Sequence, residues 1–177
     1  MLKKLAGATH LLMAGGTSAL AQNAPTATAQ TTPGRMITMA EAIAAAQARV
    51  PGGVWEAEIE TRDSRRIYEI ELVSGGRVHE VQVDAMNGQV LATEEEPIEG
   101  KLKQWFAEGR MQAAESAQNV LALTIPEIEK QMGGRVTEVS LEREDGRIVY
   151  ELEVETAGGE RDIQIDASTG QNISQVR

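Results

Sequence analysis

The feature that most constrains the fold is an internal repeat at a fixed offset of 82 residues. Between Val54 and Gly88, 13 of 35 positions carry the same residue in the second copy, without a gap. Unrelated segments of average composition would share about two. The longest shared runs are YEIEL against YELEV and VQVDAMNG against IQIDASTG. Similarity of this length indicates a duplicated structural unit, so both copies are expected to share one fold.

Each copy opens with a pattern typical of a helix N-terminus, a threonine followed three residues later by glutamate. The pattern spans Thr38–Glu41 in the first copy and Thr124–Glu127 in the second. The helices are expected to end at the Pro-Gly-Gly stretch 51–53 and at the Gly-Gly pair 133–134. These limits predict a second helix that is about one turn shorter than the first.

Three segments with two-residue alternation follow each helix and predict three strands per copy. Turns between the strands are expected at Asp63-Ser64, Gly75-Gly76, Asp145-Gly146 and Gly158-Gly159. A short meander hides its apolar face only if a helix covers it. The predicted class is therefore α+β: two repeated units, each a helix packed on a three-stranded antiparallel sheet, joined by a helical segment.

The chain start is typical of a cleavable secretory signal. Two lysines precede an apolar stretch that ends in Ala19-Leu20-Ala21, a small-residue cleavage site. The expected organisation is a signal peptide at 1–21, a flexible linker at 22–37, repeat units at 38–96 and 124–177, and a helical connector at 97–123. No segment after the signal is long and apolar enough to span a bilayer, which favours a periplasmic or secreted bacterial protein.

The connector carries apolar residues at three- and four-residue steps, which predicts one amphipathic helix with a weak point at Gly109, or two shorter helices. It contains Trp105 and Phe106, the latter being the only phenylalanine of the chain. We expect this helix to pack between the two units. Filling a groove on a partner is the functional alternative.

Composition excludes several classes of function. The formal charge of −10 argues against binding to nucleic acid, which requires clustered lysine and arginine. The chain has no cysteine, and signal removal would leave His79 as the single histidine, so a catalytic triad and a two-histidine metal site are excluded. No phosphate-binding glycine loop is present. The sequence therefore predicts no catalytic residue and no cofactor.

Outward-facing glutamates form the most unusual surface feature of the predicted sheets. They are Glu56, Glu58, Glu60, Glu69 and Glu71 in the first copy and Glu138, Glu142, Glu151, Glu153 and Glu155 in the second. One interpretation is a solvated face partly neutralised by Arg62, Arg65, Arg66 and their counterparts. The alternatives are a docking surface for a basic partner and loose binding of Ca²⁺, which no EF-hand-like spacing supports.

Six repeated residues form a structural signature: Tyr68, Asp84, Gly88, Tyr150, Asp166 and Gly170. Each aspartate ends a predicted strand four residues before its glycine, so the carboxylate is expected to cap a turn in which the glycine has a positive φ. Each tyrosine is expected in the core with its hydroxyl at the edge of the apolar face.

The repeated pattern resembles the PepSY domain family. The resemblance rests on AEAIAAAQARVPGG, YEIEL and VQVDAMNG in the first copy and on YELEV and IQIDASTG in the second, which lacks the Pro-Gly. It implies an exported, non-enzymatic module that binds proteins and inhibits or regulates a periplasmic or secreted peptidase in trans. The alternative is a structural or envelope-stress interaction module with no protease target.

Overall fold

The computed structural model describes residues 35–96 and 101–174, and the side chains of residues 35–95 and 109–174. The expected signal peptide, residues 22–34 of the expected linker, and the side chains of Trp105 and Phe106 lie outside this description. The elements in chain order are α1 (Met39–Arg49), β1 (Gly53–Arg62), β2 (Arg65–Ser74), β3 (Arg77–Asp84), β4 (Val90–Glu96), α2 (Lys101–Ser116), α3 (Val120–Met132), β5 (Arg135–Glu144), β6 (Arg147–Thr156) and β7 (Gly159–Asp166).

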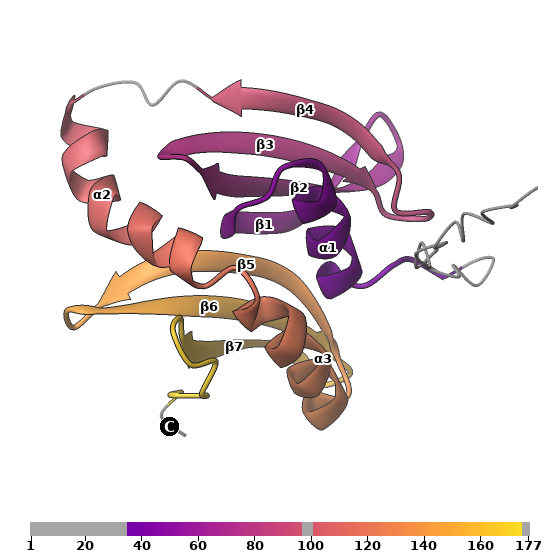
Figure 1. Cartoon of the computed structure of the whole chain (residues 1–177). Coiled ribbons are helices and arrows are strands. Elements are labelled where there is room, and N and C mark those ends of the chain that lie inside the picture. Colours follow the sequence, from indigo (N-terminus) through magenta and orange to yellow (C-terminus); the bar gives the residue numbers. More distant parts are fainter. Residues whose placement is uncertain (1–34, 97–100, 175–177) are drawn as a thin grey trace, which may run out of the picture. The chain divides into compact units, whose positions relative to one another are not determined.

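A single antiparallel sheet of seven strands in the order β4-β3-β2-β1-β5-β6-β7 joins the two repeats (Figure 1). The α+β class is confirmed, whereas the expected pair of separate three-stranded sheets is replaced by this continuous one. Strand β4 lies within the expected first repeat unit, 38–96, but was not predicted as a strand. Its alternation is broken by a register shift at Gln82/Val83 that leaves Leu91 without a partner, so the sequence pattern hides the strand.

The join between the repeats is the pairing of β1 with β5, which covers three residue pairs: Glu56 with Ser140, Ala57 with Val139, and Glu58 with Glu138. Each strand has a β-bulge next to this short ladder, between Val54 and Glu56 in β1 and between Val136 and Glu138 in β5. Bulges bend a strand away from its neighbour, so the pairing ends at both. We call this three-pair ladder the seam.

Side chains continue the connection where the strands diverge. The Tyr150 hydroxyl donates to the Val54 carbonyl across the seam, at 3.0 Å. Beyond the other bulge, the Arg135 guanidinium donates to the Ile37 carbonyl at 2.9 Å and to the Tyr68 hydroxyl at 3.1 Å. Both tyrosines are fully buried. Because an unpaired polar group is costly in the interior, these bonds fix the two repeats against each other.

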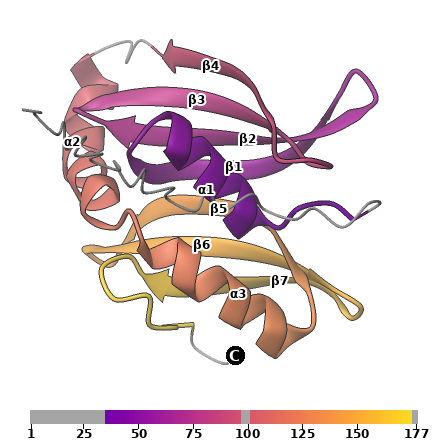
Figure 2. The ribbon, with the colours of Figure 1, turned by 45° about the vertical axis from the view of Figure 1, so that its right-hand side comes forward.

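Helices α1 and α3 lie next to each other on one face of the sheet (Figure 2). Residues from both repeats and all three helices form one core, which includes Ile43 of α1, Ala114 of α2, Ile125 of α3, Ile70 of β2 and Leu152 of β6. At Gly53 the backbone of α2 comes so close that an added Cβ would lie 1.7 Å from the Ala114 carbonyl oxygen. No helix in the described residues is long and apolar enough to cross a membrane.

The two repeats begin their helices differently. Thr38 and Glu41 form the expected capping box at α1. The second prediction was wrong, because α3 begins at Val120 with Asn119 as N-cap, and Thr124 lies inside it, donating its hydroxyl to the Val120 carbonyl at 2.9 Å. Burial of Leu121 stabilises this additional turn. Helix α3 therefore has 13 residues and α1 has 11, the reverse of the expected order.

Two further local expectations change. Helix α2 runs through Gly109, which is therefore not a break, and ends at Ser116. The last hairpin pairs Thr156 with Gly159, so its two turn residues are Ala157 and Gly158, one position earlier than expected. The other three hairpin turns lie at the expected pairs, each of which has positive φ at both residues.

Gly88 and Gly170 provide a matched test of the repeated turn. Their φ values are 74° and 72°, so alanine at either position should cost about 1 kcal/mol. An added Cβ has free space at Gly88, where the nearest atom is 3.7 Å away, but would lie 2.6 Å from the Thr124 hydroxyl at Gly170. Urea unfolding should therefore show a larger loss for Gly170→Ala than for Gly88→Ala. Equal losses, or none, would contradict this geometry.

Candidate functional site

The face of the sheet opposite the helices, which we call the open face, carries two rows of side chains that cross all seven strands. From β4 to β7, one row is Glu94, Glu80, Glu71, Glu56, Ser140, Glu151 and Gln164. The other row is Ala92, Gln82, Glu69, Glu58, Glu138, Glu153 and Asp162. The ten carboxylates in these rows, with no lysine or arginine among them, are named the acidic band. The seam makes the band continuous.

Ionisation of several carboxyl groups in the acidic band is less favourable in the folded protein than in a free glutamate. Burial raises the pKa of the Glu56 carboxyl, and Glu138 and Glu142 across the seam raise it further. Burial also raises the pKa of Glu58, with additional repulsion from neighbouring glutamates. The pKa values of Glu69 and Glu153 are raised first by burial as well. Like charges on neighbouring strands repel, so the ionised band favours the approach of positive charge.

Among the side chains that the structure describes, contacts between arginine and the band are local. Of the three arginines expected to neutralise the band, Arg62 contacts it, donating to Glu69 at 2.6 Å and to its neighbour Glu60 at 3.1 Å. Arg65 lies 3.9 Å from Asp84 instead, and Arg66 points to the sulfur of Met36. The expected neutralisation is therefore local.

A cation could use one group of carboxylates. Glu58, Glu60 and Glu69 each offer an oxygen, and these oxygens lie within 4.8 Å of one another. The Arg62 guanidinium already bonds two of the three carboxylates. A metal ion would have to displace this arginine, so the geometry is that of an ion-paired cluster.

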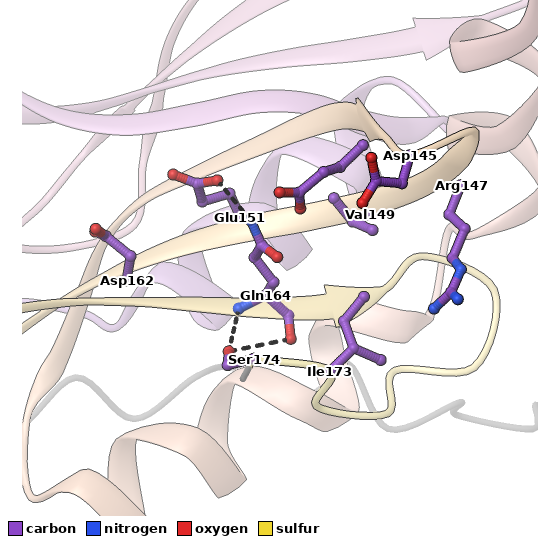
Figure 3. Close-up of a pocket in the computed structure, with 9 residues that line it drawn as sticks. Asp145, Arg147, Val149, Glu151, Asp162, Gln164, Ile173 and Ser174 are labelled. Atoms are coloured by element: carbon purple, nitrogen blue, oxygen red, sulfur yellow. Dashed lines mark hydrogen bonds between the residues drawn. The ribbon is translucent and has the colours of Figure 1, made fainter. Parts of the chain in front are cut away.

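Two pockets flank the band at matching positions of the two repeats. The pocket of the second repeat has a volume of about 470 Å³, and its lining residues include Asp145, Arg147, Val149, Gln164 and Ile173 (Figure 3). The pocket of the first repeat, of about 300 Å³, is lined by the residues 82 positions earlier: Asp63, Arg65, Ile67, Gln82 and Leu91. Each pocket therefore has both apolar and charged lining residues, next to the acidic band.

The six signature residues do not meet in one site. The Asp84 carboxylate accepts from the backbone N–H groups of Met86 at 2.8 Å and Asn87 at 3.2 Å. Asp166 accepts likewise from Ser168 and Thr169, and the Ser168 hydroxyl bond is the main cause of a lowered pKa of Asp166. Burial raises the pKa of both Tyr68 and Tyr150. The aspartates and glycines form the turns, and the tyrosines form the hydrogen bonds beside the seam. The six residues therefore do not make up one reactive site.

Sequence reasoning missed the continuity of the band, the paired pockets and Arg110. The Arg110 side chain of α2 donates to the Leu141 carbonyl at 3.1 Å and to Glu142 at 3.2 Å, and lies 4.5 Å from the centre of the Trp55 ring. The pairing of β1 with β5 could have been anticipated. In two separate sheets the first strand of each copy would be an uncovered edge, which another strand can cover.

The raised pKa values predict how stability depends on pH. An unfolded glutamate ionises near pH 4.5, whereas a folded carboxyl with a raised pKa resists ionisation. The folded state therefore loses stability as pH rises above 4.5, and the loss is complete above the folded pKa. The urea midpoint should be higher at pH 5 than at pH 7, and Glu56→Gln should reduce that difference. Glu127→Gln, on the exposed side of α3, is the control. The same pH difference in both variants would contradict the prediction.

The match to a family model agrees with the repeated architecture. The family model "PepSY: Peptidase propeptide and YPEB domain" matches residues 36–94 and 113–176. The uncharacterized Bacillus subtilis (strain 168) protein YkoJ is 31% identical over 144 residues, which cover 78% of this chain and 74% of YkoJ. The crystal structure of a "putative lipoprotein" from Clostridium difficile 630 is 17% identical, with a TM-score of 0.43, covering 79% of this chain and 92% of that one. Since the family model matches both repeats, the chain belongs to the PepSY family.

Proposed function

We propose that this chain is an exported protein-binding module that uses the acidic band to engage a basic surface of a partner. The observation that carries the proposal is the continuity of the band, in which ten carboxylates cross seven paired strands. Sites that depend on catalysis place reactive groups together in a cleft, whereas this surface offers repeated charges of one sign over a broad sheet. Such a surface steers and orients a partner of opposite charge.

The class of partner that we propose is a periplasmic or secreted peptidase, bound in trans and restrained by the contact. Support comes from the family, whose matched description is that of a peptidase propeptide domain. Export rests on the signal-like residues 1–21. The candidate surface also supports regulation by binding. It consists of carboxylates positioned by strand pairing, and no nucleophile is aligned with a base among them.

Inhibition of a purified thermolysin-type metallopeptidase tests the proposal. The double variant Glu56→Gln/Glu138→Gln removes one charge on each side of the seam, at matching positions of the repeats. Loss of two ion pairs with the partner should raise the half-inhibitory concentration about tenfold at low salt, and high salt should reduce the difference. Glu115→Gln/Glu127→Gln removes two charges from helices α2 and α3 and should leave inhibition unchanged.

Three results are distinguishable in this assay. Inhibition that weakens only in the band variant would support the proposal. Equal inhibition by both variants would remove the acidic band from the contact. If the protein leaves peptidase activity unchanged at every concentration, the regulatory role is wrong, and a structural or envelope-stress interaction module becomes the better hypothesis.

A further inference from the structure

The outer edges of the two repeats differ. In the first repeat, β4 pairs with β3 from Val78 to Val83 and covers that edge. In the second repeat, residues 167–174, the described part of the segment after β7, bond only the end of the strand. The contacts are an isolated bridge between Ile165 and Asn172, a bond from the Ile173 N–H to the Gln164 carbonyl at 2.8 Å, and bonds involving Asp166 and Ser174.

The backbone pairing along the β7 edge has ended by Ser174, the last residue that the structure describes. At this position the Ser174 hydroxyl, in place of a backbone carbonyl, accepts the Gln164 N–H at 2.7 Å (Figure 3). The Ser174 N–H donates to the Asn172 side chain at 2.8 Å, which closes a local turn. The matching residue of the first repeat, Ala92, instead continues the ladder along β3. The edge is thus paired with a strand in the first repeat, whereas in the second repeat the described residues after β7 form no strand along it.

The first half of β7, around Glu160 and Asp162, presents backbone groups to which another strand could bond. In an antiparallel sheet, alternate residues direct their N–H and C=O groups to the same side. Gln164 and Asp166 direct their N–H groups outward, to Ser174 and to the Gln171 carbonyl. Glu160 and Asp162 therefore direct theirs outward too, and within residues 35–96 and 101–174 no strand lies beyond β7 to receive them.

The charges beside this edge indicate which segment fits. Glu160 and Asp162 are exposed on the open face, next to Glu155 and Glu153 of β6. A second copy of the chain, paired antiparallel through β7, would place these carboxylates against their own equivalents, which is unfavourable. Lysine or arginine in a foreign strand would meet them with opposite charge. On the helix side, the half-buried Ile163 favours an aliphatic residue.

We propose that the outer edge of β7 binds an extended segment of a partner protein as an eighth, antiparallel strand. The segment carries basic residues facing the acidic band and aliphatic residues facing α3. This inference rests on the proposed protein-binding function and specifies where a strand of the partner binds. Main-chain bonds supply affinity in this recognition mode, and the alternating side chains supply specificity.

The test measures binding of the labelled peptide Lys-Val-Lys-Val-Lys-Val-Lys to the purified protein by fluorescence anisotropy. Asp162→Pro removes an outward N–H without breaking the ladder to β6, since proline is tolerated on an edge strand when its N–H side faces solvent. This variant should retain its melting temperature and bind at least tenfold more weakly. Asp162→Asn keeps the N–H and removes the charge, so binding should weaken only about two- to fivefold.

Modified peptides provide the matched control. Methylation of the central lysine amide blocks a bond to Asp162 and should weaken binding at least tenfold, whereas methylation of a valine amide, which faces away from β7, should have little effect. Equal binding by Asp162→Pro and the wild-type protein, or by both methylated peptides, would overturn the proposal. If Asp162→Pro bound the peptide as the wild-type protein does but Glu56→Gln/Glu138→Gln did not, the β7 edge would be excluded and the acidic band would still be the docking surface. Dimerisation through β7 that Asp162→Pro abolishes would also overturn it.

Discussion

The structure depends on the three residue pairs of the seam, where β1 and β5 cover each other's edge. Without this pairing, each repeat would be a small sheet under its own helix, with one long edge open to solvent. The bulges on either side limit the ladder, and the Tyr150 and Arg135 side chains bond the backbone of the first repeat beyond them. A short ladder, reinforced by buried hydrogen bonds, thereby joins the two halves into one core.

The same pairing has an electrostatic consequence on the open face. It places Glu58 opposite Glu138 and brings Glu56 under the repulsion of Glu138 and Glu142. Burial and repulsion both oppose ionisation there, so the folded protein retains charges that reduce its own stability at neutral pH. A basic partner of the kind proposed would relieve this repulsion on binding. Groups that reduce stability in this way are typical of functional sites, where local consistency is sacrificed.

Much of the fold could be predicted from the sequence, because the repeat and the two-residue alternation specify which faces of β1, β2 and β3 are buried. The capping box of α1 was also predicted correctly. The same pattern at Thr124 gave a wrong helix start, because burial of Leu121 extends α3 by one turn. Strand β4 was hidden by its register shift. Seven of the ten carboxylates of the acidic band belong to the predicted set of outward glutamates, which did not include Glu80, Glu94 or Asp162. The continuity of the band depends on which edges pair, a long-range choice that local patterns do not encode.

If the seam makes the two repeats one cooperative unit with one continuous acidic band, the backbone amides of residues 56–58 and 138–140 should be among the most protected in the protein. Native-state hydrogen exchange measures this protection. We expect the hydrogen-bonded amides of the seam to exchange only through global unfolding, with the same free energy as the central amides of β2 and β6. Exchange of the seam amides at a much lower free energy, followed by separate unfolding of the repeats in urea, would contradict the account.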